Sequence, residues 1–203
     1  MIVRVISLIL ILLFLLGAAG CSGANDGAQE NAGDSAPANI DDSAQESPDC
    51  GGPTGNDQGS GAANNSVLNL TLNDLDGDPI DLSGFLGEIV VLNFWASWCP
   101  PCRQEMPELN ELDKEFKESC AAVLITVNLT DGQRETMETA RQFIDDGGYG
   151  FTVLIDDQGL LSRQFNISAI PQTFIIDRSG NISGSIIGST TRSAILDEVN
   201  AAS

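Results

Sequence analysis

The chain carries the stretch IVVLNFWASWCPPC at residues 89–102. An apolar run leads directly into two cysteines, and a segment with helical character follows from Arg103 towards Lys117. A strand that runs into Cys-x-x-Cys at a helix start places the first thiol where free backbone N–H groups and the positive end of the helix dipole converge. This lowers the pKa of that thiol and favours the thiolate, the form that attacks disulfides. The pattern predicts Cys99 as the nucleophile and Cys102, one helical turn on, as the resolving thiol.

Other uses of a Cys-x-x-Cys pair fit the sequence less well. Zinc takes about four ligands, whereas the chain has no histidine, 5 cysteines in all and no second Cys-x-x-Cys. Haem attachment needs a histidine directly after the second cysteine, where Arg103 stands. A purely structural disulfide stays open as an alternative, although so short a loop constrains the unfolded chain little. We therefore expect dithiol redox chemistry, with no metal and no cofactor.

Residues 1–21 have the pattern of a bacterial export signal. Arg4 precedes an uncharged apolar run over residues 5–16, and small residues lead from there to Cys21. A cysteine in that place resembles a lipobox, in which the cysteine is acylated and becomes the mature N-terminus. An uncleaved anchor, or an ordinarily cleaved signal with Cys21 incidental, are the alternatives, although the run is short for a span of about 20 residues. We expect an extracytoplasmic lipoprotein, attached through Cys21 to the bacterial cell membrane.

Residues 22–65 differ in composition from the rest of the chain. They are mostly Gly, Ala, Asn, Ser, Asp and Gln, with eight acidic residues and neither Lys nor Arg. Such a segment cannot bury enough apolar surface to offset the conformational entropy lost on ordering. We interpret it as a disordered acidic tether between a lipid anchor and a folded domain at residues 66–203.

The net charge of −20 bears on the partners. The acidic excess extends over both the tether and the folded domain, and such a surface repels nucleic acid and anionic membranes. We therefore expect no nucleic-acid partner, and membrane contact through the lipid anchor only.

From Ser66 onwards the sequence alternates strand and helix patterns. Leu68, Leu70 and Leu72 alternate with polar residues, and Asp76-Gly77 is typical of a hairpin turn. Further strands are predicted at 80–82, 89–95, 121–128, 151–155, 173–176 and 182–187, and helices at 103–117, 133–145, 160–165 and 191–201. This order of elements predicts a three-layer α/β sandwich.

Two motifs give the chain a family resemblance. NFWASWCPPC at residues 93–102, with IPQTF at residues 170–174, resembles the thioredoxin superfamily and in particular its exported ResA/TlpA-type thiol–disulfide oxidoreductases of the redoxin (AhpC/TSA-like) group. The resemblance covers roughly residues 66–202. It implies an α/β thioredoxin fold, a three-layer α/β/α sandwich with an N-terminal β-hairpin extension and a central helical insertion.

The resemblance also implies roles for individual residues. Pro171 is expected to be cis and to face the cysteines, which leaves the backbone of Ile170 free to pair with a substrate strand. The implied substrate-binding residues are Trp98, Pro100, Pro101, Ile170 and Pro171.

A proton-transfer role is implied for Asp131. Asn93 stands where thioredoxin carries a buried aspartate, and ResA-type proteins are expected to place an acidic residue after the next central strand. Asp131 matches that place. The alternative is an ordinary solvated loop acid.

The function implied by the resemblance is the reduction of disulfides in exported proteins such as apocytochrome c. Such a reductase, expected to be a monomer, needs recharging by a membrane electron donor of the CcdA/DsbD kind. One alternative is a thiol peroxidase of the peroxiredoxin type with antioxidant activity, but Ala96 and Leu92 stand where its threonine or serine and its proline are needed. Another is a non-catalytic peptide-binding module, against which the intact cysteine pair argues.

Two further cysteines have no assigned role. Cys50 lies in the tether and Cys120 lies just before a predicted strand. In an oxidising compartment they could form a disulfide, or they could act as independent thiols.

Overall fold

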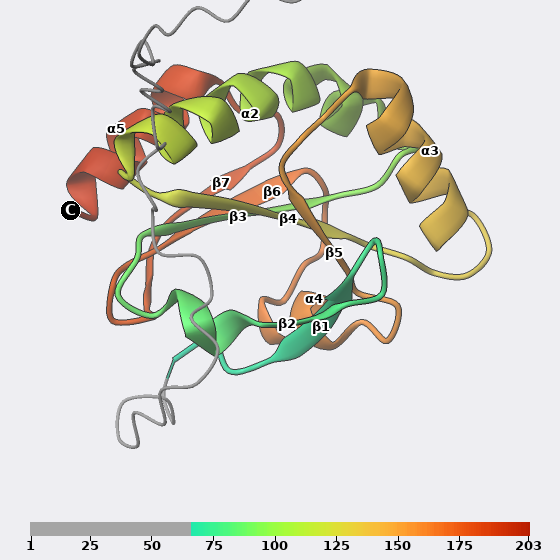
Figure 1. Cartoon of the computed structure of the whole chain (residues 1–203), viewed down its shortest axis with the longest axis horizontal. Helices are drawn as coiled ribbons and strands as arrows, with labels where there is room; N and C mark the ends of the chain where they lie inside the picture. The colour runs from blue at the N-terminus through green and yellow to red at the C-terminus, as the bar shows by residue number, and fades with distance from the viewer. Residues whose placement is uncertain (1–65) are drawn as a thin grey trace, which may run out of the picture. The chain divides into compact units, whose positions relative to one another are not determined.

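The computed structural model describes residues 66–203 of the chain. The predicted signal, the tether, Cys21 and Cys50 lie outside the described residues. The elements, labelled as in Figure 1, are β1 Thr71–Asp74, β2 Pro79–Asp81, η2 Leu82–Phe85, β3 Val90–Trp95, α2 Pro100–Ser119, β4 Val123–Asn128, α3 Met137–Gly147, β5 Thr152–Ile155, α4 Leu160–Gln164, β6 Gln172–Ile176, β7 Ile182–Ile187 and α5 Arg192–Ala201. Within residues 66–203, no helix has both the length and the apolar character needed to cross a bilayer.

The strands form one mixed sheet in the order β2-β1-β5-β4-β3-β6-β7. β3, β4 and β5 are parallel, whereas β6 runs antiparallel to β3 and β1 antiparallel to β5. The pairs β1–β2 and β6–β7 are antiparallel hairpins. Figure 1 shows α2, α3 and α5 on one side of this sheet and α4 on the other. The predicted three-layer α/β/α arrangement is therefore confirmed, with the hairpin at its N-terminal end and α3 between β4 and β5.

β3 is an interior strand of the sheet, between β4 and β6. All six of its residues are buried, as expected for a strand covered by helices on both sides. Val91 and Trp95 join the core formed with α2, α3 and α5, whereas Val90, Leu92 and Phe94 join the core formed with η2 and α4. β3 ends at Trp95, and the chain continues from there directly into the cysteine segment.

α2 begins three residues earlier than the sequence pattern predicts. Cys99 is its N-cap, and Pro100 and Pro101 occupy the first helical positions, where a missing backbone N–H leaves no bond unmade. Pro107 lies inside the helix, which continues as one element to Ser119. The cysteine pair therefore lies at the N-terminus of a 20-residue helix.

α3 begins later than predicted, at Met137 instead of Gln133. The Oδ1 atom of Asp131 accepts hydrogen bonds from the backbone N–H groups of residues 133–135, which holds these residues in a turn. Thr136 then caps the helix, with a reciprocal capping box to Thr139. Local side-chain acceptors thus replace the first helical turn that was predicted at residues 133–136.

Candidate active site

Cys99 and Cys102 form a disulfide at the start of α2, with their Cα atoms 5.3 Å apart. The backbone N–H of Cys102 donates to Cys99 Sγ at 3.4 Å. Cys99 is 3% exposed and Cys102 is fully buried. After reduction, the same N–H and the helix dipole are placed to stabilise a thiolate on Cys99, while Cys102 is shielded by the helix.

The loop before β6 lies against the cysteine pair. The Ile170–Pro171 peptide bond is cis, as the resemblance implies. The Sγ atom of Cys99 lies 3.8 Å from the carbonyl oxygen of Ile170. Because β6 pairs antiparallel with β3, the N-terminal end of β6 lies beside the C-terminal end of β3, so the residues before β6 lie near the residues after β3. Two motifs separated by 71 positions are thereby brought together.

The rim of the site carries an exposed aromatic residue. Trp98 is 38% exposed, and the Arg134 guanidinium lies over its ring, 3.4 Å from the centroid. Pro100 is exposed and Pro101 is half-buried. Trp98, Pro100 and Pro101 flank Cys99 in the chain, and their role in substrate binding stays a prediction.

A buried carboxylate lies one helical turn after Cys102. Glu105 is 2% exposed, and its Oε1 and Oε2 atoms accept hydrogen bonds from Asn93 Nδ2 at 2.9 Å and from Thr190 N at 3.0 Å. Burial raises the pKa of Glu105, and the two hydrogen bonds only partly oppose that shift. Residues three apart share one helix face, so this carboxyl group lies on the same side of α2 as Cys102.

Sequence analysis did not identify Glu105. The spacing that would have revealed it is the run of Cys102, Glu105, Met106 and Leu109 on one face of the helix, where an acid occupies an apolar position. Asn93 Oδ1, also buried, has no hydrogen-bond partner among the described residues. Rotation of the Asn93 amide would offer that oxygen to a protonated Glu105.

Asp131 lies on the exposed surface of the loop between β4 and α3. Backbone N–H groups, that of Glu135 first and then that of Gln133, hold the pKa of its carboxyl below the usual range. Its proton-transfer role stays a prediction. The neighbouring Glu135, by contrast, is fully buried, and sequence analysis missed it as well.

The remaining cysteines are only partly described. Cys120 caps the C-terminus of α2 in a left-handed conformation and is disulfide-bonded. Because Cys50 lies outside the described residues, a Cys50–Cys120 pairing stays a prediction. In the described part of the chain, no cluster of three or more His, Cys, Asp or Glu residues could hold a metal ion.

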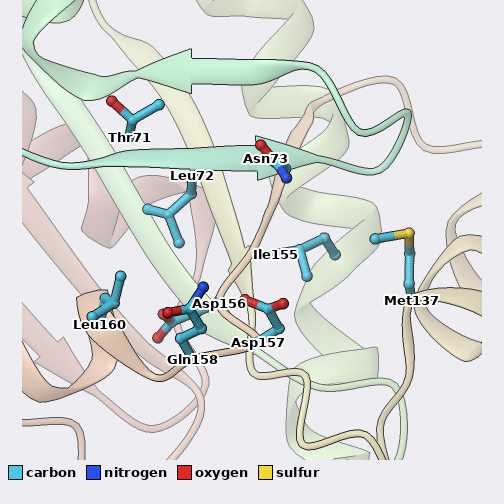
Figure 2. Close-up of a pocket in the computed structure, with 9 residues that line it drawn as sticks. All are labelled: Thr71, Leu72, Asn73, Met137, Ile155, Asp156, Asp157, Gln158 and Leu160. Carbon is cyan, nitrogen blue, oxygen red and sulfur yellow. The ribbon is translucent and has the colours of Figure 1, made fainter.

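A polar pocket lies away from the cysteines, with a volume of about 180 Å³. Figure 2 shows its lining, which comes from β1, the end of β5 and the starts of α3 and α4. Asp156 is buried there, and its two carboxylate oxygens accept the backbone N–H groups of Leu161 and Ser162. Its carboxylate thus caps α4, and we assign no chemistry to this pocket.

Comparison with known proteins agrees with this geometry. The model of the AhpC/TSA family matches residues 63–185, a range that contains the cysteine pair, Glu105 and the cis Ile170–Pro171 bond. The chain belongs to the AhpC/TSA family. Thioredoxin-like protein YneN of Bacillus subtilis (strain 168) is 37% identical over 123 residues, which are 61% of this chain and 70% of that protein.

Two further relatives show which members of the AhpC/TSA family this chain resembles. Thiol-disulfide oxidoreductase ResA of Geobacillus kaustophilus (strain HTA426) is 34% identical over 134 residues, 66% of this chain and 74% of that protein. The structure of the pneumococcal exposed lipoprotein thioredoxin Etrx1 from Streptococcus pneumoniae strain TIGR4 matches with a TM-score of 0.57 and 30% identity, covering 65% of this chain and 98% of that one. These findings confirm the thioredoxin-like fold and the ResA type. The chain is an enzyme, a thiol–disulfide oxidoreductase, with Cys99 and Cys102 as its disulfide-forming pair.

Proposed function

We propose that this oxidoreductase reduces disulfides of exported proteins, such as apocytochrome c, while tethered to the outer face of the cell membrane. The observation that carries the proposal is the position of Cys99 Sγ. It accepts the N–H of Cys102 at the helix start and lies 3.8 Å from the Ile170 carbonyl, where a bound polypeptide would run.

The reaction starts from a Cys99 thiolate and a Cys102 thiol. Cys99 Sγ attacks one sulfur of the substrate disulfide, so that bond breaks, a mixed disulfide forms and the other substrate sulfur leaves as a thiolate that takes up a proton. Cys102 then loses its proton and attacks Cys99 Sγ. The Cys99–Cys102 disulfide forms, the mixed disulfide breaks, and the second substrate sulfur leaves and is protonated. Two electrons pass from the cysteine pair to the substrate.

The Ile170–Pro171 loop supports binding of an extended substrate segment. Among residues 66–203, no backbone-to-backbone hydrogen bond uses the N–H or C=O of Ile170. An extended peptide beside Cys99 can pair with these groups in the manner of an added strand. Trp98, Pro100 and Pro101 would contact the substrate side chains on either side of its disulfide.

Glu105 suits the second step, in which Cys102 must lose its proton. Its carboxyl is buried on the Cys102 face of α2, and burial raises its pKa above that of an exposed glutamate, which makes it a stronger proton acceptor. We assign to Glu105 the proton-accepting role for Cys102, with Asp131 as the alternative acid on the loop.

Reduction outside the cytoplasm requires a source of electrons. A membrane electron donor of the CcdA/DsbD kind would reduce the Cys99–Cys102 disulfide after each cycle. Acylation at Cys21 would keep the enzyme beside that donor, and the similarity to a pneumococcal exposed lipoprotein thioredoxin supports this arrangement.

The decisive experiment is trapping with a Cys102→Ser variant of the full chain. This variant keeps the attacking thiol but cannot resolve the mixed disulfide, so it should accumulate covalent complexes with exported substrates, identifiable by mass spectrometry. A Cys99→Ser, Cys102→Ser double variant is the matched control and should trap nothing. Equal trapping by both variants, or trapping of no exported protein by either, would contradict the proposal.

Peroxidase activity is the second candidate, because residues 68–88 also resemble the start of a peroxiredoxin. Ala96 and Leu92 are both fully buried and offer no hydroxyl near Cys99. The wild-type protein should reduce insulin disulfides in the presence of dithiothreitol and should consume hydrogen peroxide no faster than the Cys99→Ser variant. The insulin assay also separates an enzyme from a non-catalytic peptide-binding module, which would be inactive.

A further inference from the structure

Glu135 is a buried carboxylate that takes no part in the two thiol–disulfide exchange steps. It lies in the loop between β4 and α3 and is 0% exposed. Its Oε1 atom accepts hydrogen bonds from Ser97 N at 3.0 Å and Asn128 Nδ2 at 2.7 Å, and its Oε2 atom accepts one from Ser97 Oγ at 2.7 Å. All three contacts donate to the carboxylate, so both of its oxygens have hydrogen-bond partners. Within residues 66–203 it forms no ion pair with a Lys or Arg.

The partners of Glu135 place it at the redox site. Ser97 lies two residues before Cys99, and Asn128 is the last residue of β4. The backbone N–H of Leu129 also donates to the carbonyl of Trp95 at 3.0 Å. Glu135 therefore joins the end of one parallel strand to the turn that leads from the neighbouring strand into the nucleophile.

The loop is built to hold Glu135 in this position. Asp131 Oδ1 accepts three backbone N–H groups from residues 133–135, and the carbonyl of Glu135 accepts the N–H groups of Asp131 and Gly132 at 3.0 Å each. Arg134, the preceding residue, lies over the Trp98 ring. Two consecutive loop residues thus contact two consecutive residues, Ser97 and Trp98, directly before Cys99.

A buried negative charge at this place has an electrostatic consequence. A carboxylate near a thiolate disfavours the thiolate by like-charge repulsion, and a pair whose thiolate is less stable is a stronger reductant. The other charged or titratable groups on the elements next to the pair are Arg134 over Trp98, Arg103 over Phe143, the exposed Asp131 and the buried Glu105. Glu135 differs from the exposed ones because no water screens it.

We propose that Glu135 is a positioning residue of the redox site: it holds the Ser97–Trp98 turn that presents Cys99, and its charge raises the free energy of the Cys99 thiolate, which makes the pair more reducing. The inference rests on the dithiol chemistry of Cys99 and Cys102 and deepens it. Glu135 acts through Ser97 and does not touch the substrate.

The Glu135→Gln variant of the full chain removes the charge of this side chain while it keeps the hydrogen bonds. The glutamine oxygen can accept from Ser97 N and Asn128 Nδ2, and its amide can donate to Ser97 Oγ, which also accepts, so all three contacts are kept while the charge is lost. We expect the pH dependence of iodoacetamide labelling to show a lower pKa for the Cys99 thiol in this variant than in the wild type. At a given pH below that pKa, the variant should hold about three- to tenfold more thiolate. The equilibrium with dithiothreitol should shift towards the reduced enzyme by a similar factor.

The matched control is Glu138→Gln, an identical change at an exposed position of α3, which should leave both quantities unchanged. Ser97→Ala tests the opposite sign: it removes one donor from the carboxylate and leaves the charge less compensated, so the thiolate fraction should fall. Unchanged thiol pKa and dithiothreitol equilibrium in both Glu135→Gln and Ser97→Ala would overturn the proposal. Failure of the proposed function is distinct, since wild-type protein would then not reduce insulin.

Discussion

Asn93 Nδ2 donates to Glu105 Oε1 at 2.9 Å and to Thr173 Oγ1 at 3.0 Å, and thereby joins β3, α2 and β6 beneath the cysteine pair. An uncharged amide on β3 leaves Glu105 as the ionisable group of this cluster. Two carboxyl groups in contact could not both ionise at moderate pH. The buried acid of this cluster, Glu105, therefore lies on α2, the helix that begins at the cysteine pair, and β3 contributes only the uncharged Asn93.

Cys99 should be the cysteine that alkylates in the reduced protein. Its thiol lies at the N-cap and receives the Cys102 N–H, whereas Cys102 is fully buried. Brief iodoacetamide treatment followed by mass spectrometry should find the label on Cys99, with a thiol pKa below about 8.5. Preferential labelling of Cys102 would reverse the two roles.

Glu105→Gln should slow resolution of the mixed disulfide, because Cys102 loses its proton acceptor. General acid–base contributions of this kind are commonly about 10²-fold or more in rate. Stopped-flow measurement of the second step would show the loss, with Glu118→Gln, at an exposed position of the same helix, as the control. An unchanged rate would remove Glu105 from the mechanism.

The same variant should change the pH dependence of stability. Because burial raises the pKa of Glu105, the folded state binds this proton more tightly than the unfolded state does. The free energy of unfolding of the wild type therefore falls as pH rises between the ordinary and the raised pKa. The Glu105→Gln variant has no such titrating group. Its free energy of unfolding, measured by urea titration, should therefore rise relative to that of the wild type from pH 4 to pH 8. A constant difference would contradict the raised pKa.

Asp131→Asn tests the loop acid. If Asp131 assists proton transfer at the cysteines, its loss should lower the Cys99 pKa by removing a like charge, and should slow disulfide reduction. Asparagine keeps an oxygen that can accept the same backbone N–H groups, so the loop is preserved. Insulin reduction and labelling kinetics that match the wild type would leave Asp131 with only its role in the turn.

Phe94→Ala should destabilise the fold by about 3–5 kcal/mol. Phe94 is fully buried on the face of β3 away from the cysteines, with its ring centroid 5.5 Å from that of Phe165 and 5.9 Å from that of Phe174. Urea unfolding measures the loss, and Phe94→Leu should lose less because more of the volume stays filled. A loss below about 1 kcal/mol would mean that this second core is not closely packed.

Cys21→Ala should release the enzyme from the membrane. Acylation with two or more chains gives stable anchoring, whereas a single chain binds reversibly. Cell fractionation with fatty-acid labelling should place label and wild-type protein in the membrane fraction, and the variant outside it. Wild-type protein free in the medium without label would show that the signal is cleaved in the ordinary way.

Local patterns predicted the central elements accurately. The apolar run before Cys99 became β3 within one residue, and β7 has the predicted bounds of 182–187. The start of α3 was predicted four residues too early because residues 133–136 look helix-compatible in sequence, while Asp131 and Thr136 bind backbone N–H groups there and delay the start of the helix to Met137. Side-chain competition for backbone N–H groups is a short-range effect that hydrophobic periodicity does not contain.

The nucleophile, the resolving thiol and the strand–helix junction were determined by the sequence itself, because residues 89–102 hold all of them within one continuous segment. The burial of Glu105 and Glu135 was decided by tertiary structure alone. Glu105 receives one of its two hydrogen bonds from Thr190, 85 positions away, and Glu135 receives two from Ser97, 38 positions away. In sequence, a glutamate is expected on the surface because an ionised carboxylate is costly to bury. Only the folded chain supplies the donors that make these two buried positions stable, and with them the charges that surround the cysteine pair.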